Sequence, residues 1–219
     1  SAVERSLEAL LAELPVGERS SQIWSPDFSA IDQGLTVPAQ VNYVGKAANL
    51  FELGYELDGS YAVITRYLAT TWLWDRVRVQ GGAYGAFCSF DPFTGVLTYV
   101  SYRDPNVQET LAIYDGSGGF LRDSPIADDE LTKSIIGTIG DLDAYQLPDA
   151  RGYTSMVRYL TDVDDGYRQK MRDQVLGTTS GDFAAFADVL DEIKAKGRVA
   201  VLGGAEAVAE AGLEPIKVL

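Results

Sequence analysis

Two side chains that can hold a developing negative charge stand close together in the stretch "RVRVQGGAYG", residues 76–85. Arg78 supplies a guanidinium, Tyr84 supplies a phenol, and the pair Gly81 and Gly82 lies between them. Glycines at this place permit another backbone to approach closely. A guanidinium and a phenol on one rim can together hold a peptide carbonyl and stabilise an oxyanion that forms on it. These four residues are therefore the first candidate for a substrate-binding site.

The same stretch has a simpler structural interpretation, which residue types alone do not exclude. Arg78 can pair with a neighbouring acid such as Asp75, and Tyr84 can be a half-buried aromatic residue of a strand. Neither interpretation needs anything beyond ordinary packing and pairing, so both remain open at the level of composition and spacing.

The overall charge limits the partners that the chain can have. The 219 residues include 32 acidic and 18 basic side chains, which gives a formal net charge of −14. Nucleic-acid backbones are bound by clustered Lys and Arg, so a nucleic-acid partner is excluded. The acidic balance either steers cationic substrates or partners toward the chain, or simply solvates helix surfaces. No apolar run approaches the roughly 20 residues that cross a bilayer, so no membrane partner is expected.

The absence of histidine limits the chemistry even more strongly. The chain has no histidine and one cysteine, Cys88. It therefore lacks the soft ligands that zinc, copper and iron prefer, and it lacks the commonest general base near neutral pH. A complete metalloenzyme or catalytic triad cannot be assembled from this chain alone, and we expect no metal site in it.

Four further segments show weaker signals. The strand–glycine–helix pattern at 201–212 does not match G-x-G-x-x-G and is typical of a tight turn. The "GSGG" at 116–119 has no lysine and no preceding strand, and indicates an interrupted helix. Residues 162–166 suggest a calcium loop, but the register is wrong and the final glutamate is missing, so a capped helix start is expected. Cys88 alternates with core positions and is expected to be buried.

Hydrophobic periodicity predicts a domain in which strands come first and helices follow. A hairpin is expected from strands at 84–90 and 95–102, joined through residues 91–95. Asp104 and Pro105 are expected to begin a helix that runs to about residue 121. Residues 18–37 show no pattern and are expected to be an irregular lead-in. Further helices are expected at 3–14, 61–77, 128–143, 150–161, 165–177, 181–197 and 205–212, and further strands at 39–48, 198–204 and 214–219. This order predicts an α+β fold, an antiparallel sheet covered by helices.

Several long blocks of the sequence, in order, carry a resemblance to a known family. The blocks are "VPAQVNYVGKAANL", "TWLWDRVRVQGGAYGAFCSFDPFTG", "YVSYRDPN", "ETLAIYDG" and "LTKSIIGTIGDLDAYQLPDARGY". Through them the chain resembles the C-terminal domain of the presequence-protease branch of the pitrilysin and insulin-degrading-enzyme metallopeptidases, from about residue 37 to 153 and more loosely to the end.

The resemblance implies a four-domain enzyme whose two halves close on a peptide. In such enzymes the first half carries the zinc motif H-x-x-E-H and the general base, and the last domain contributes an arginine and a tyrosine across the chamber. The matching positions here are Arg78 and Tyr84, which become the expected catalytic residues, with Arg76 as the rival for the arginine role. Because this chain has no histidine, zinc is expected only in the full-length parent, on a half that is not part of this sequence.

The expected function is therefore that of a substrate-clamping, transition-state-stabilising domain of a zinc-dependent oligopeptidase. Its substrates would be unfolded peptides such as cleaved targeting sequences, its partner the zinc-bearing N-terminal half, and it would be inactive alone. Residues 1–28 would form a lead-in, and residues 29–219 a pitrilysin-type chamber domain. The alternative is a catalytically silent peptide-binding or scaffolding domain. The resemblance implies a mitochondrial or plastid location in a eukaryote, or the cytoplasm of a bacterium.

Overall fold

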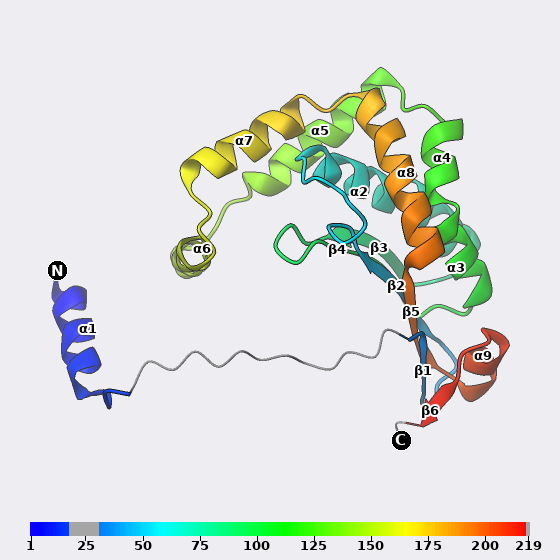
Figure 1. Cartoon of the computed structure of the whole chain (residues 1–219), viewed down its shortest axis with the longest axis horizontal. Helices are drawn as coiled ribbons and strands as arrows, with labels where there is room; N and C mark the ends of the chain where they lie inside the picture. Colours follow the sequence, from blue (N-terminus) through cyan, green and yellow to red (C-terminus); the bar gives the residue numbers. More distant parts are fainter. Residues whose placement is uncertain (18–30, 218–219) are drawn as a thin grey trace. The chain divides into compact units, whose positions relative to one another are not determined.

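The computed structural model of the chain describes residues 1–17 and 31–217 (Figure 1). These residues fall into two units, Ser1–Ala30 and Ile31–Leu219. In the first unit, α1 (Ala2–Glu13) begins with a capping box, in which the Ser1 hydroxyl accepts from the Glu4 backbone N–H and the Glu4 carboxylate accepts from the N-terminus. None of the α1 residues is buried, although Leu7, Leu10 and Leu11 make one apolar stripe.

The second unit is built on a six-stranded sheet with the order β3-β4-β2-β5-β1-β6. The neighbours β3–β4, β4–β2 and β2–β5 are antiparallel, whereas β1 is parallel to both β5 and β6. The strands are β1 (Gln33–Thr36), β2 (Tyr43–Asn49), β3 (Gly85–Phe90), β4 (Val96–Tyr102), β5 (Arg198–Gly203) and β6 (Pro215–Lys217).

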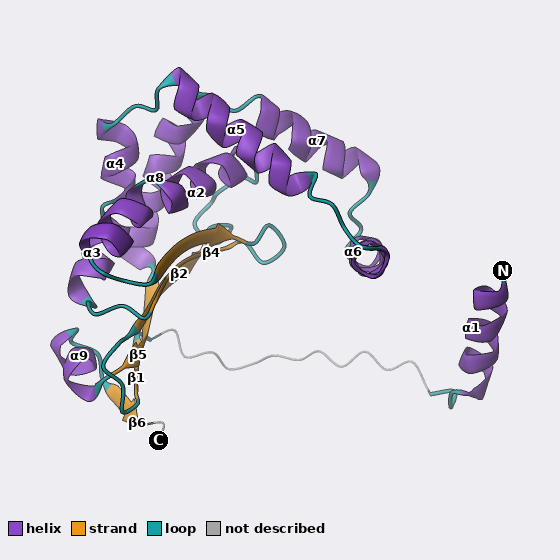
Figure 2. Cartoon of the chain, turned by 180° about the vertical axis from the view of Figure 1, so that it is seen from behind, coloured by secondary structure: helices purple, strands orange, loops and turns teal. Residues whose placement is uncertain are grey.

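The helices that pack on the sheet lie on one side of it, whereas α6 stands apart beyond α5 and α7, and Figure 2 shows the strands with their other face bare. The contacts that fix this layer are those of α2 with β3, of α3 and α8 with β2, and of α9 with β1 and β5. The helices are α2 (Ser60–Thr70), the π-helix η1 (Trp74–Gln80), α3 (Gln108–Asp115), α4 (Ser117–Asp123), α5 (Asp128–Leu142), α6 (Pro148–Leu160), α7 (Asp165–Leu176), α8 (Ser180–Lys196) and α9 (Ala205–Glu210).

Alternation along the strands explains why only one face is covered. In β4 the side chains of Leu97, Tyr99 and Ser101 are buried against the helices, whereas those between them are partly or fully exposed. A strand places successive side chains on opposite faces of the sheet. The alternating burial along β4 therefore means that one face is covered by helices and the other faces solvent. The helices meet the dry side with fully buried residues such as Ile64 and Leu68 of α2.

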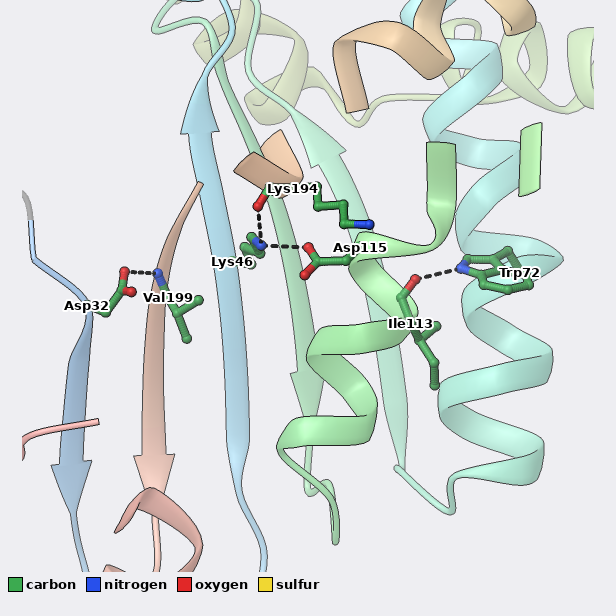
Figure 3. A network of polar contacts seen from close by, with 7 residues as sticks. All are labelled: Asp32, Lys46, Trp72, Ile113, Asp115, Lys194 and Val199. Carbon is green, nitrogen blue, oxygen red and sulfur yellow. Dashed lines mark hydrogen bonds and ion pairs between the residues drawn. The ribbon is translucent and has the colours of Figure 1, made fainter. Parts of the chain in front are cut away.

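One charged side chain is buried on the helix-covered face. Lys46 of β2 is 6% exposed, and its Nζ donates to the Asp115 carboxylate at 2.5 Å and to the Lys194 carbonyl at 3.2 Å (Figure 3). These acceptors lie at the C-terminal ends of α3 and α8. A buried ammonium requires such partners because desolvation is costly. The same figure shows Trp72 Nε1 donating to the Ile113 carbonyl, which joins the end of α2 to α3.

The α+β layout is confirmed, but four details of the prediction are wrong. The sheet is mixed, because residues 33–36 of the expected irregular lead-in form β1 between β5 and β6. The expected helix to residue 121 is two helices, since α3 ends at Asp115 and α4 begins at Ser117, with Gly116 between them. Asp104 does not cap a helix that starts at Pro105: α3 begins only at Gln108. Finally, the helix expected over 61–77 changes to a π-helix at Trp74.

Candidate functional site

Arg78 lies in a π-helix, and not at the start of a strand. In η1 the Gly81 N–H donates to the Arg76 carbonyl at 3.0 Å, which is the i→i+5 bond of a π-helix. The Ala83 N–H then donates to the Val77 carbonyl at 3.1 Å and closes the end of the element. π-Helical turns are rare and frequently occur at functional sites.

The Arg78 guanidinium is held by an aromatic ring and not by an acid. Its Cζ lies 3.8 Å from the centroid of the Trp74 ring, a cation–π contact that leaves the N–H groups at the rim of the guanidinium available. Asp75 pairs elsewhere: it accepts from Gln80 Nε2 at 2.7 Å and lies 3.8 Å from Arg76 Nε. The pairing of Arg78 with Asp75, which composition left open, is therefore not present.

Each of the two positions after the π-helix requires glycine, but for a different structural reason. A Cβ on Gly81 would lie 2.6 Å from the Val77 carbonyl oxygen, so a side chain does not fit there. Gly82 has φ +80°, a left-handed conformation that glycine adopts without cost. The close approach predicted for the glycines is thus made by the chain's own backbone.

Tyr84 lies at the sheet edge with an open phenol. Its side chain is 67% exposed, and its backbone N–H donates to the Tyr102 carbonyl at 3.0 Å, which extends the β3–β4 ladder by one bond. Its ring meets Tyr102 edge-on at 5.6 Å between centroids, and Tyr102 meets Tyr43 in the same way at 5.4 Å. Neighbouring aromatic edges therefore fix the ring, while within the described residues the hydroxyl has no hydrogen-bond partner.

Arg78 and Tyr84 line the same open depression, which has a volume of about 680 Å³. Arg76 does not: its guanidinium lies over Trp72, at 5.2 Å from the ring centroid, and borders a separate hollow beside α4. Gly82 is part of the lining, whereas Gly81 is not. The lining residues are Val41, Trp74, Arg78, Val79, Gly82, Ala83, Tyr84 and Arg103.

A second segment, Arg103–Asn106, holds this depression together, and residue types alone did not single it out as functional. Asn106 Nδ2 donates to the Gly81 carbonyl at 2.6 Å and so anchors the turn between Arg78 and Tyr84. Asp104 is fully buried and forms an isolated antiparallel bridge with Asn42. Its carboxylate accepts from Thr110 Oγ1 at 2.7 Å and from the Asn106 N–H at 2.9 Å. The "RDPN" that the resemblance already contained is thus a clamp on the glycine turn.

We expect Asn106→Ala to loosen this turn without unfolding the domain. The lost hydrogen bond contributes about 1 kcal/mol to the free energy of unfolding. The midpoint temperature of thermal unfolding should therefore fall by roughly 2–4 °C for a domain of this size. Gln80→Ala is the matched control, because its amide also bonds on this turn but at an exposed site within η1. Differential scanning calorimetry of both variants checks the difference, and equal shifts would contradict the clamp.

The depression lies at one end of the bare sheet face. Across this face Phe87, Val100, Gly45 and Ala200 are register partners on β3, β4, β2 and β5. Phe87 is 57% exposed, and within residues 31–217 no helix packs along this side. The edge-on contact of Tyr84 with Tyr102 joins the depression to the end of this face.

The other sequence candidates have structural explanations. Cys88 is buried, and burial raises the pKa of its thiol, so it is not poised as a nucleophile. Asp164 caps α7 by accepting from the Tyr167 N–H at 2.6 Å, as the capped helix start predicted. Residues 201–212 form β5 and the short α9 around a turn at Gly204. Among the described residues no three His, Cys, Asp or Glu side chains gather where they could hold a metal, and none of the helices found there is long and apolar enough to cross a membrane.

Comparison with known proteins identifies the fold and the family. Residues 32–205 match the family described as the PreP C-terminal domain. The chain belongs to this family. The chain is also 48% identical over 213 residues to presequence protease 1, chloroplastic/mitochondrial, of Arabidopsis thaliana. That alignment covers 97% of this chain and 20% of the plant protein, so the chain spans about a fifth of the length of this relative.

Solved structures show the same architecture at low sequence identity. A peptidase M16 inactive domain from Pseudomonas fluorescens has a TM-score of 0.61 and 18% identity, with 99% of this chain and 53% of the other covered. Pitrilysin itself has a TM-score of 0.54 and 14% identity, with 78% of this chain and 19% of the other covered. These likenesses show the fold, and the match to the PreP C-terminal domain confirms the family that the resemblance named.

Proposed function

We propose that this PreP C-terminal domain clamps a peptide substrate and stabilises the transition state in a zinc-dependent oligopeptidase. The observation that carries the proposal is the shared depression of Arg78 and Tyr84 at the end of a bare sheet face. Residues 29–219 would form one wall of a chamber in a four-domain enzyme, and residues 1–28 the segment that leads into it. The substrates would be unfolded peptides such as cleaved targeting sequences.

The chemistry follows from what the two side chains offer to a peptide carbonyl. Both are donors, and both lie outside the hydrogen-bond network of the described residues, so neither must break a bond before it binds. When a carbonyl carbon becomes tetrahedral, its oxygen gains negative charge, and donors aimed at that oxygen bind it more strongly than the ground-state carbonyl. Trp74 and Tyr102 hold the donors in place beforehand, so little reorganisation accompanies the reaction.

The metal of such a peptidase does not fit this chain. The chain has no histidine, and its single cysteine is buried in β3 with a raised thiol pKa. Zinc would therefore have to be bound by the N-terminal half of a longer polypeptide, which would also supply the general base. The chain alone would then be inactive, because it contributes donors but neither nucleophile nor base.

The bare sheet face supports a peptide as the ligand. It carries apolar or small residues such as Phe87, Val100 and Ala200 beside the polar Ser89 and Arg198, and a peptide in extended form could lie along them. The formal net charge of −14 would attract cationic peptides to the chain at long range. The compartment follows the same reasoning: the Arabidopsis relative is named chloroplastic/mitochondrial, so a eukaryotic parent would act in an organelle.

Reconstitution tests this function directly. The chain is assayed for cleavage of an unstructured peptide alone, then with a zinc-bearing N-terminal half of a presequence protease added in trans. We expect no cleavage by the chain alone and cleavage by the mixture. If the chain binds peptides in a salt-sensitive way that does not depend on Tyr84, and the mixture never cleaves, the silent binding domain is correct instead. Metal-dependent cleavage by the chain alone would contradict both.

A further inference from the structure

Arg103 has a backbone conformation that arginine seldom adopts. It is the last residue before the buried Asp104, and its φ is +50°, in the left-handed region. Non-glycine residues rarely occur there, and such strain persists where the surroundings determine it, often at ligand-binding sites. Here the surroundings are the antiparallel bridge between Asn42 and Asp104 on one side, and the Tyr102 carbonyl that binds the Tyr84 N–H on the other.

Arg103 also borders the same depression as Arg78 and Tyr84. The lining contains two arginines and no acidic residue, although the chain as a whole carries a net charge of −14. Within residues 1–17 and 31–217 the Arg103 side chain makes no ion pair, and neither does Arg78. The depression is therefore a local positive site in an acidic molecule.

We propose that Arg103 binds a carboxylate of the peptide that Arg78 and Tyr84 hold. Arginine presents a planar fork of donors that matches a carboxylate in bidentate fashion, and it remains charged at every working pH. The carboxylate belongs either to an acidic side chain near the bond held by Arg78 and Tyr84 or to the C-terminus of a short peptide. This inference rests on the proposed function only in taking a peptide as the ligand.

Binding to the chain alone tests the site without any cleavage. Three short peptides, all N-acetylated, are titrated in turn while the arginine Nε–H signals are followed by NMR. The first has a central glutamate and an amidated C-terminus, the second has glutamine instead, and the third has glutamine with a free C-terminal carboxylate. We expect the Arg103 signal to move with the first or third peptide, which identifies the source of the carboxylate, and not with the second.

Two substitutions establish that Arg103 is responsible. Arg103→Gln should weaken binding of the carboxylate peptide roughly fivefold, as expected for a partly exposed ion pair. Arg103→Asn removes the same charge with a residue that tolerates positive φ, so it keeps the turn folded and should give the same loss. Arg151→Gln, on the exposed α6, is the matched control and should change nothing.

Cleavage by the reconstituted peptidase then separates this inference from the proposed function. The kcat/KM ratio for the carboxylate peptide over the neutral one should fall about fivefold in Arg103→Gln. If the peptides are cleaved but this ratio and the binding are unchanged, the carboxylate site at Arg103 is wrong, while the proposed role of Arg78 and Tyr84 remains. If selective binding by Arg103 is seen but nothing is cleaved, the site is correct and the peptidase function is wrong. Selectivity that disappears only in Arg78→Gln also overturns the assignment to Arg103.

Discussion

Replacing Tyr84 by phenylalanine is expected to lower the kcat of the reconstituted peptidase by a factor of about 10² to 10³. Loss of one donor to a developing oxyanion typically has this effect. KM should change little, because the ring still packs edge-on against Tyr102 and only the hydroxyl is lost. The fold should also be unaffected, since within the described residues that hydroxyl has no partner.

The measurement is steady-state cleavage of an unstructured fluorogenic peptide, with circular dichroism to confirm folding. Tyr159→Phe is the matched control: Tyr159 is 83% exposed on α6, away from the depression, and its loss of a hydroxyl should leave kcat unchanged. If Tyr84→Phe turns over as fast as the wild type, Tyr84 is only an aromatic residue of the strand edge. A rise in KM at constant kcat would mean that it binds substrate and transition state equally.

The largest loss of stability is expected from Asp115→Ala. Lys46 is 6% exposed, and without this carboxylate its ammonium would keep only the Lys194 carbonyl as acceptor (Figure 3). Removing one partner of a buried pair costs about 3–5 kcal/mol, because the remaining charge stays desolvated. The free energy of unfolding, measured in urea, should fall by about that amount.

Replacing the other partner of the pair, Lys46, should lower the free energy of unfolding much less. Lys46→Met keeps the apolar stem and removes the buried charge, and it leaves behind Asp115, which is 28% exposed and can be hydrated. We expect a loss of about 1 kcal/mol or less. Lys196→Met removes a fully surface pair with Glu192 and serves as the control, with a change below roughly 0.5 kcal/mol. Equal, small effects of Asp115→Ala and Lys46→Met would show that the pair is not buried in solution.

Much of the fold could be predicted because its elements have strong local signals. The hairpin of β3 and β4 follows from alternation on both sides of a short turn, and α8 follows from its periodic apolar face. β1 could not be predicted in this way. It has four residues, among them a glycine, and each of them pairs with a β5 residue 167 positions away in the sequence. The parallel part of the sheet is therefore a tertiary feature.

The candidate residues were chosen from their types, and the structure adds that Arg78 and Tyr84 line one depression, while their role stays a prediction. Donor chemistry and the glycine pair pointed to Arg78 and Tyr84, and the family resemblance gave them a role. The π-helix left no local pattern, because its wider turn is fixed by the Gly81 backbone, which lies too close to Val77 for any side chain. Arg103 and Asn106 were missed because their importance arises only when residues 103–106 meet the glycine turn. A polar residue directly before "DP", at the end of a strand, was the available signal.

The π-helix also has a consequence for how this domain tolerates insertions and deletions. Each hydrogen-bonded ring in η1 includes one residue more than in an α-helix. Removal of a single residue between Trp74 and Gln80 would allow the segment to close as an ordinary α-helix, in which each residue accounts for about 100° of rotation. If the residue removed were Asp75, Arg76 or Val77, Arg78 would turn away from Tyr84 although every residue that lines the depression was still encoded. The geometry of the site therefore depends on the number of residues in η1 as well as on their types.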